Sequence, residues 1–111
     1  MIDLIGFYEE LDNDKESIGM ILEAYIEEYS GFESKILEYY QSNDWSELHL
    51  ATHSLKGILS SFGESEITVK LEDIERATSN KTAPDEDSIL NVVNNLPSIE
   101  AHIREAIAAL T

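Results

Sequence analysis

The residues whose types and spacing could support chemistry lie in one short run, in which a histidine is followed by a lysine and two glycines. Lys56 and Gly57 come three and four residues after His53, and Gly63 comes ten residues after it. A neutral imidazole has a ring-nitrogen lone pair that can attack phosphorus without a separate base. Lys56 lies one helical turn from His53, about 5–6 Å between Cβ atoms, so its ammonium could reach a phosphoryl group on the ring. This run favours phosphoryl acceptance at His53, with Lys56 as its electrostatic partner.

The run falls within a helical pattern that turns His53 outward. At about 100° per residue, His53 lies about 130° from the centre of the apolar stripe. An interior glycine costs a helix about 1 kcal/mol relative to alanine, so Gly57 indicates that something approaches closely there. Gly63 fits either a helix C-cap or a docking role. The stripe comprises Trp45, Leu48, Thr52, Leu55, Leu59 and Phe62, and the outward face holds His49, His53, Lys56, Gly57 and Ser60.

These residues resemble the signature of histidine-containing phosphotransfer (HPt) domains of two-component phosphorelays. Two positions depart from the family pattern. Thr52 replaces the alanine that usually precedes the histidine, and His49 stands where the family often has arginine, which removes a permanent positive charge. The resemblance spans most of the chain in its helix pattern, but the specific motif is confined to residues 44 to 75. That motif comprises Asp44, Trp45, Leu48, Ala51, Thr52, His53, Leu55, Lys56, Gly57 and Gly63, followed by Ile67 and the pair Ile74-Glu75.

The resemblance implies a phosphoryl carrier without a cofactor of its own. In this family the histidine takes a phosphoryl group from the aspartyl phosphate of one receiver domain and passes it to the aspartate of another, with Mg²⁺ held by the receiver. The expected partners are response-regulator receiver domains, including one carried by a hybrid sensor kinase. His49, Gly57, Ser60 and Gly63 are expected to contact the receiver. The chain has no Gly-rich phosphate loop, strand lysine or Asp-Phe-Gly segment, so ATP-dependent kinase activity is not expected.

Two other functions stay open on the sequence. One is a helical adaptor that binds a receiver without taking phosphate. The other is a metal-binding bundle, because His49 and His53 are four residues apart, a spacing that can place two imidazoles on one metal. Helical zinc proteases have Glu after the first histidine and need a third ligand, whereas Leu50 follows His49 here, and no metal site is expected. His102 has no cation or glycine beside it and is expected to be a surface or packing residue.

The composition of the chain narrows the remaining classes of function. The 111 residues are expected to form one domain over 1–111, and the absence of cysteine excludes disulfides, thiolate nucleophiles and cysteine-ligated zinc. The balance of 23 acidic residues against 7 Lys and Arg, with a net charge of −16, argues against nucleic-acid binding. No stretch approaches the roughly 20 apolar residues of a membrane span. A cytoplasmic monomer is expected, and Met1 favours a stand-alone carrier over a piece of a hybrid kinase.

Apolar periodicity predicts an all-α fold, an antiparallel up-down-up-down four-helix bundle with a short additional N-terminal helix. Gly31 is expected to bend the second helix without resetting its phase, and Pro97 is expected to kink the last one. The predicted helices cover Ile2 to Leu11, residues 15 to 41, the His53 helix from a cap at Ser42-Asn43-Asp44 to Gly63, Glu64 to Thr78, and one helix from Asp85 onward.

Overall fold

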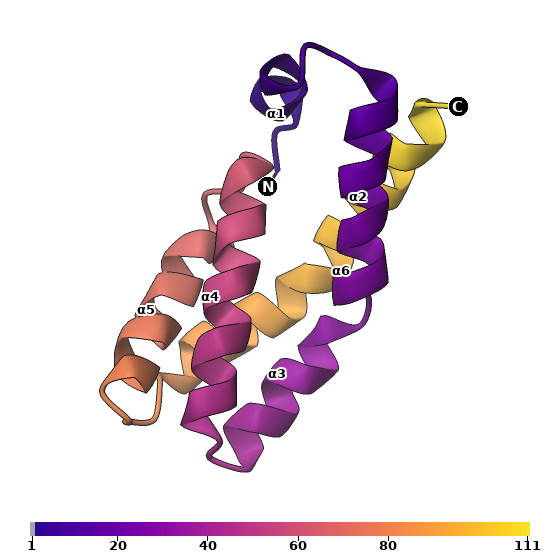
Figure 1. Cartoon of the computed structure of the whole chain (residues 1–111). Coiled ribbons are helices and arrows are strands. Elements are labelled where there is room, and N and C mark those ends of the chain that lie inside the picture. The colour runs from indigo at the N-terminus through magenta and orange to yellow at the C-terminus, as the bar shows by residue number, and fades with distance from the viewer. Residues whose placement is uncertain (1) are drawn as a thin grey trace.

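In the computed structural model, which describes residues 2–111, the chain is built from helices (Figure 1). Residues 2–111 contain no strand, which confirms the predicted all-α class. The helices are α1 (Ile5–Glu10), α2 (Lys15–Tyr29), α3 (Phe32–Gln41), α4 (Trp45–Ser61), α5 (Ile67–Ser79) and α6 (Glu86–Ala109).

Side-chain caps fix where the two helices of the candidate site begin. The Asp44 carboxylate accepts a hydrogen bond from the Glu47 backbone N–H at 3.2 Å, as the predicted cap requires. The buried Glu64 carboxylate accepts from the N–H groups of Ile67 at 2.8 Å and Thr68 at 3.0 Å. Glu64 therefore caps α5 from outside the helix, and α5 begins three residues later than the periodicity indicated.

The single helix predicted over residues 15 to 41 is wrong, because the chain breaks between α2 and α3. Ser30 has an extended backbone (ψ 126°) and Gly31 has a left-handed one (φ 71°). Glu100 of α6 holds this break, accepting from the Ser30 hydroxyl at 3.1 Å and from the Gly31 N–H at 3.2 Å. The apolar phase continues across the break, so periodicity alone could not reveal it. By contrast, α6 runs without interruption through Pro97, as predicted.

The predicted inward stripe of α4 is confirmed. Trp45 is half-buried at the start of the helix, and the remaining members are fully buried: Leu48, Thr52, Leu55, Leu59 and Phe62. At the end of α4 the N-terminal segment approaches, with the Asp3 N–H donating to the Phe62 carbonyl at 3.1 Å and Phe7 packing edge-on against the Phe62 ring. The opposite face of α4, which carries His53, Gly57 and Ser60, is exposed.

Helix packing places α4 between α3 and α5 (Figure 1). α6 contacts α2, α3 and α5, so that α3, α4, α5 and α6 contact one another in a closed cycle. His49, early in α4, contacts Thr78, late in α5, whereas His53 contacts the earlier Glu75, so α4 and α5 run antiparallel. Within residues 2–111, no helix combines the length and apolarity needed to cross a membrane.

Candidate functional site

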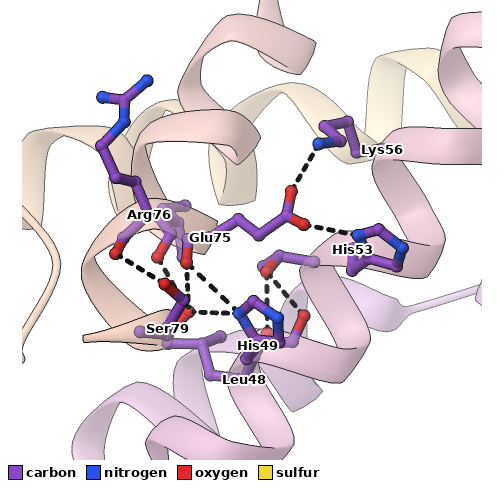
Figure 2. Close-up of polar contacts among 10 residues, drawn as sticks. Leu48, His49, His53, Lys56, Glu75, Arg76 and Ser79 are labelled. Atoms are coloured by element: carbon purple, nitrogen blue, oxygen red, sulfur yellow. Dashed lines mark hydrogen bonds and ion pairs between the residues drawn. The ribbon is translucent and has the colours of Figure 1, made fainter. Parts of the chain in front are cut away.

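His53 projects from the outer face of α4, with 64% of its side chain exposed. This confirms the predicted orientation. Its Nδ1 contacts Oε1 of Glu75, which reaches across from α5 (Figure 2). An ionised carboxylate only accepts hydrogen bonds, so Nδ1 carries the ring hydrogen and Nε2 carries the lone pair of the neutral ring. Nε2 lies on the opposite edge of the ring, so the nitrogen that carries the lone pair faces away from Glu75.

Lys56 meets the same carboxylate. Its Nζ lies 2.5 Å from Oε2 of Glu75, and its side chain is 28% exposed (Figure 2). Burial opposes ionisation of Glu75, but the Lys56 ammonium and the His53 ring outweigh it and hold the pKa of this carboxyl below its ordinary value. Glu75 is therefore an anion at neutral pH. The sequence predicted a cation beside His53, and the structure shows that this cation is already paired.

Glu75 is the site residue that the sequence analysis missed. It was noted only as part of the pair Ile74-Glu75, with no role assigned. Its side chain is 15% exposed, and it joins His53 and Lys56 although 22 residues separate it from the histidine. A polar residue directly after the inward-facing Ile74 was the available signal, but only the packing of α5 on α4 shows which residues it meets.

His49 lies deeper than the other outward residues, half-buried between α4 and α5. Its Nδ1 is 3.2 Å from the Glu75 carbonyl oxygen and 3.1 Å from the Thr78 hydroxyl oxygen (Figure 2). Its ring is nearly parallel to that of His53, with 6.2 Å between the ring centres and 11° between the planes. The structure thus brings His49, His53, Lys56 and Glu75 together.

The remaining predicted contact residues lie along α4 and just beyond it. Gly57 and Ser60 are exposed. A Cβ at Gly57 would meet no described atom within 4 Å, so packing within residues 2–111 does not explain this glycine. Gly63 has φ 75°, and its Cβ would lie 2.3 Å from the Asp3 carbonyl oxygen. Backbone conformation and the approach of the N-terminal segment therefore account for Gly63, which follows the last turn of α4.

Two further expectations concern residues outside the group formed by His49, His53, Lys56 and Glu75. Thr52, which departs from the family pattern, is fully buried, and its hydroxyl donates to the Leu48 carbonyl at 2.8 Å. The extra hydroxyl is therefore satisfied within α4. His102 is half-buried and lines a hollow with Ile2 and Ile99, in agreement with the expected packing role.

The geometry does not favour the metal alternative. Zinc lies about 2.0–2.1 Å from each histidine nitrogen, which requires two ligating rings to converge. The rings of His49 and His53 are instead parallel and 6.2 Å apart, and both Nδ1 atoms face residue 75 of α5. Across residues 2–111, no group of three or more His, Asp or Glu side chains is arranged to hold a metal ion.

Shallow hollows flank the histidines on both sides. One follows the groove between α4 and α5 and is lined by His49, Lys56, Glu72, Glu75, Arg76 and Ser79. The other lies toward α2 and α3, where Tyr29, Phe32 and Leu50 are rimmed by Glu28 and Glu47. Leu50 is 60% exposed, one turn before His53. This stretch of α4 thus lies between a charged groove and a hollow that mixes apolar and acidic side chains.

Comparisons with protein-family models, with curated proteins and with solved structures each find no match. The motif and the geometry of these side chains are therefore the grounds on which a function can be assigned.

Proposed function

We propose that this chain is a phosphorelay carrier of the HPt kind, in which His53 accepts a phosphoryl group from a receiver aspartyl phosphate and passes it to the aspartate of another receiver. One observation carries the proposal. An exposed imidazole has its Nδ1 held by an ionised carboxylate, its Nε2 has no hydrogen-bond partner among residues 2–111, and a lysine lies on the same carboxylate. This arrangement suits reversible transfer to nitrogen and needs no general base.

In the proposed step, the Nε2 lone pair of His53 attacks phosphorus as the bond from phosphorus to the aspartyl oxygen breaks. The aspartate leaves as a carboxylate, and the Nδ1 hydrogen stays on the ring. Positive charge develops on the imidazole, and the Glu75 carboxylate at Nδ1 offsets it. In the reverse direction a receiver carboxylate attacks phosphorus and the ring nitrogen leaves with the bonding pair. Mg²⁺ would be supplied by the receiver.

Lys56 has one role at rest and another in the phosphorylated state. At rest its ammonium neutralises Glu75, so it adds little net charge to the site. A phosphoryl group on His53 carries about two negative charges at neutral pH and competes with Glu75 for the same ammonium. Lys56 therefore stabilises the phosphorylated state by exchanging part of one ion pair for another. This exchange stabilises that state less than the approach of an unpaired cation would.

The proposal extends to the architecture and the setting of the chain. The closed cycle of contacts among α3, α4, α5 and α6 supports an antiparallel four-helix bundle with α1 and α2 added at one end. The proposed carrier is a cytoplasmic monomer without ATP-dependent kinase activity. Gly57 and Ser60, both exposed beside His53, would lie under the receiver.

The first prediction tests the nucleophile. His53→Gln should abolish labelling by a phosphorylated receiver, because it removes the attacking nitrogen. It should leave stability within about 0.5 kcal/mol, as is usual for exposed positions. The measurement is acid-labile phosphate on the chain after incubation, with circular dichroism to monitor folding and His102→Gln as the matched control that keeps full labelling. Label that persists in His53→Gln, on His49 or His102, would refute the assignment. If the parent chain binds phosphorylated receivers without taking up label, the chain is the helical adaptor and not a phosphoryl carrier.

A further inference from the structure

The second imidazole of the site has no part in the transfer described above. His49 has two neutral partners at Nδ1, the Glu75 carbonyl oxygen and the Thr78 hydroxyl. A carbonyl oxygen only accepts, so Nδ1–H donates, and a second proton can be taken up only at Nε2. Protonation of His49 would therefore create an imidazolium without breaking its contacts with α5.

The position of that charge relative to His53 follows from the parallel rings. Both Nδ1 atoms face residue 75, so both Nε2 atoms lie on the ring edges away from α5 (Figure 2). A phosphoryl group on His53 would project from the same side on which His49 gains its proton. The 6.2 Å between ring centres is short enough for direct electrostatic coupling.

The fixed charges around His49 balance one another. They comprise Lys56, Glu72, Glu75 and Arg76 in the groove between α4 and α5, and Asp44 and Lys81 in the hollow at the start of α4. These are three cations and three anions, and Lys56 is engaged by Glu75. A proton on His49 would thus supply a positive charge that the resting site has not already neutralised.

We propose that His49, when protonated, stabilises the phosphoryl group on His53, so that the lifetime of the phosphorylated carrier depends on pH near neutrality. The inference rests on the proposed function, because it assigns a further side chain to the same site. By linkage, the phosphoryl group favours protonation of His49 by the same factor by which the proton favours the phosphoryl group. Two negative charges at about 6 Å in water raise the titration midpoint of an imidazole by about 0.5 to 1 pH unit, according to ionic strength.

The test uses phosphoramidate, which phosphorylates imidazoles without a receiver. Its P–N bond breaks, ammonia leaves, and a new N–P bond forms at His53. The titration midpoint of the His49 ring is then followed by NMR in the full chain, with and without phosphate on His53. We expect the midpoint to rise by about half a pH unit or more in the parent. No rise is expected in His53→Gln treated in the same way.

Two variants separate charge from packing at position 49. His49→Asn keeps an N–H donor toward the Glu75 carbonyl but cannot titrate, and His49→Arg carries a permanent charge. Phosphate on His53 should be lost from His49→Asn about three to ten times faster than from the parent at mildly acidic pH, and at a similar rate at alkaline pH. His49→Arg should retain phosphate longer than His49→Asn at both pH values.

The outcomes are distinguishable. Phosphate on His53 with an unchanged His49 midpoint overturns this inference and leaves the proposed function intact. Phosphate on His49 in place of His53, or on neither ring, overturns both. A shifted midpoint in a chain that exchanges phosphate with no receiver supports the coupling between the two rings and refutes the phosphorelay role.

Discussion

At the scale of single residues, Glu75 determines how the other side chains of the site behave. It fixes the tautomer of His53, neutralises Lys56 and, through its carbonyl oxygen, orients His49. The histidine, the lysine and their outward orientation could be predicted from the sequence, because these residues lie within two turns of one helix. Glu75 could not, because its role depends on how α5 is aligned along α4, and that alignment is set by buried apolar contacts.

Glu75→Gln should destabilise the chain at neutral pH but not in acid. Because the pKa of Glu75 in the folded chain is below the ordinary value of 4.5, its ionised form stabilises the fold above that pH. The contribution is lost as pH falls through the lower folded-state pKa. Urea denaturation should show a loss of about 1 kcal/mol near pH 7 that shrinks as the pH falls below 4.5. Glu72→Gln, an exposed neighbour on α5, is the control. An equal loss at neutral and acidic pH would contradict the electrostatic role of Glu75.

Lys56→Ala should slow transfer by about three- to tenfold at low salt without abolishing it, because the ammonium stabilises charge but makes no bond to phosphorus. The substitution also leaves Glu75 unneutralised beside the phosphoryl group. Glu75→Gln in the Lys56→Ala background should therefore restore part of the rate. Timed transfer from a phosphorylated receiver, at low and high salt, measures both effects. A double variant whose rate equals the product of the two single effects would show that Lys56 and Glu75 act independently, and would contradict this prediction.

At the scale of elements, local signals predicted the helices and their caps better than their interruptions. Asp44 caps α4 and the apolar stripe of α4 is buried, as expected from the sequence. The break at Gly31 was missed because it is stabilised from outside, by Glu100 of α6. The start of α5 was misplaced because Glu64 caps it from three residues away. The first error arises because a side chain distant in sequence satisfies the backbone at the break, and the second because the capping residue itself was counted as helical.

The two glycines at α4 should respond in opposite ways to substitution. Gly57→Ala should raise the free energy of unfolding by about 0.5–1 kcal/mol, since nothing described lies within 4 Å of its Cβ and alanine favours a helix. Gly63→Ala should lower it by about 1–3 kcal/mol, because of the left-handed backbone and the Asp3 carbonyl. Denaturant titrations measure both. A stabilised Gly63→Ala would mean that the N-terminal segment does not pack as described.

Gly57 also allows stability to be separated from transfer. Gly57→Leu should unfold at a higher temperature than the parent, yet accept phosphate from a receiver much more slowly, because leucine would occupy space about 5–6 Å from His53, Cβ to Cβ. Gly57→Ala should fall between the two in transfer rate. If Gly57→Leu transfers at the parental rate, the exposed glycine does not clear a docking surface.

At the scale of the whole molecule, the distribution of charge distinguishes the face of the site. Residues 45–81, which include α4 and α5, hold six acidic residues and four Lys or Arg, a net charge of −2. The rest of the chain holds the other −14 of the −16. Because an anionic phosphoryl donor is repelled least where negative charge is sparse, this distribution favours approach over α4 and α5. Composition predicted an acidic protein, but only the fold shows that the two helices of this weakly acidic segment lie side by side (Figure 1).

Leu50 provides the test of that approach, since this exposed apolar side chain borders both the hollow at the start of α4 and the one that contains Phe32. An aspartate at this position adds charge where a receiver would bury the side chain. Leu50→Asp should therefore slow transfer from a receiver by about tenfold below saturation, which corresponds to about 1.4 kcal/mol of lost association. Raising the receiver concentration should restore the rate, and labelling of His53 by phosphoramidate should be unchanged, because neither depends on docking affinity.

The matched control is Met20→Asp, which places the same charge at an equally exposed apolar residue on α2 (66% exposed, against 60% for Leu50). Its effect on transfer should be small, because it adds only long-range repulsion, which salt screens. If the two variants slow transfer equally, net charge and not contact governs docking, and the receiver does not cover Leu50. If Leu50→Asp also slows labelling by phosphoramidate, the substitution acts on His53 itself. Only a loss confined to transfer between proteins, at Leu50 and not at Met20, locates the receiver over this part of α4.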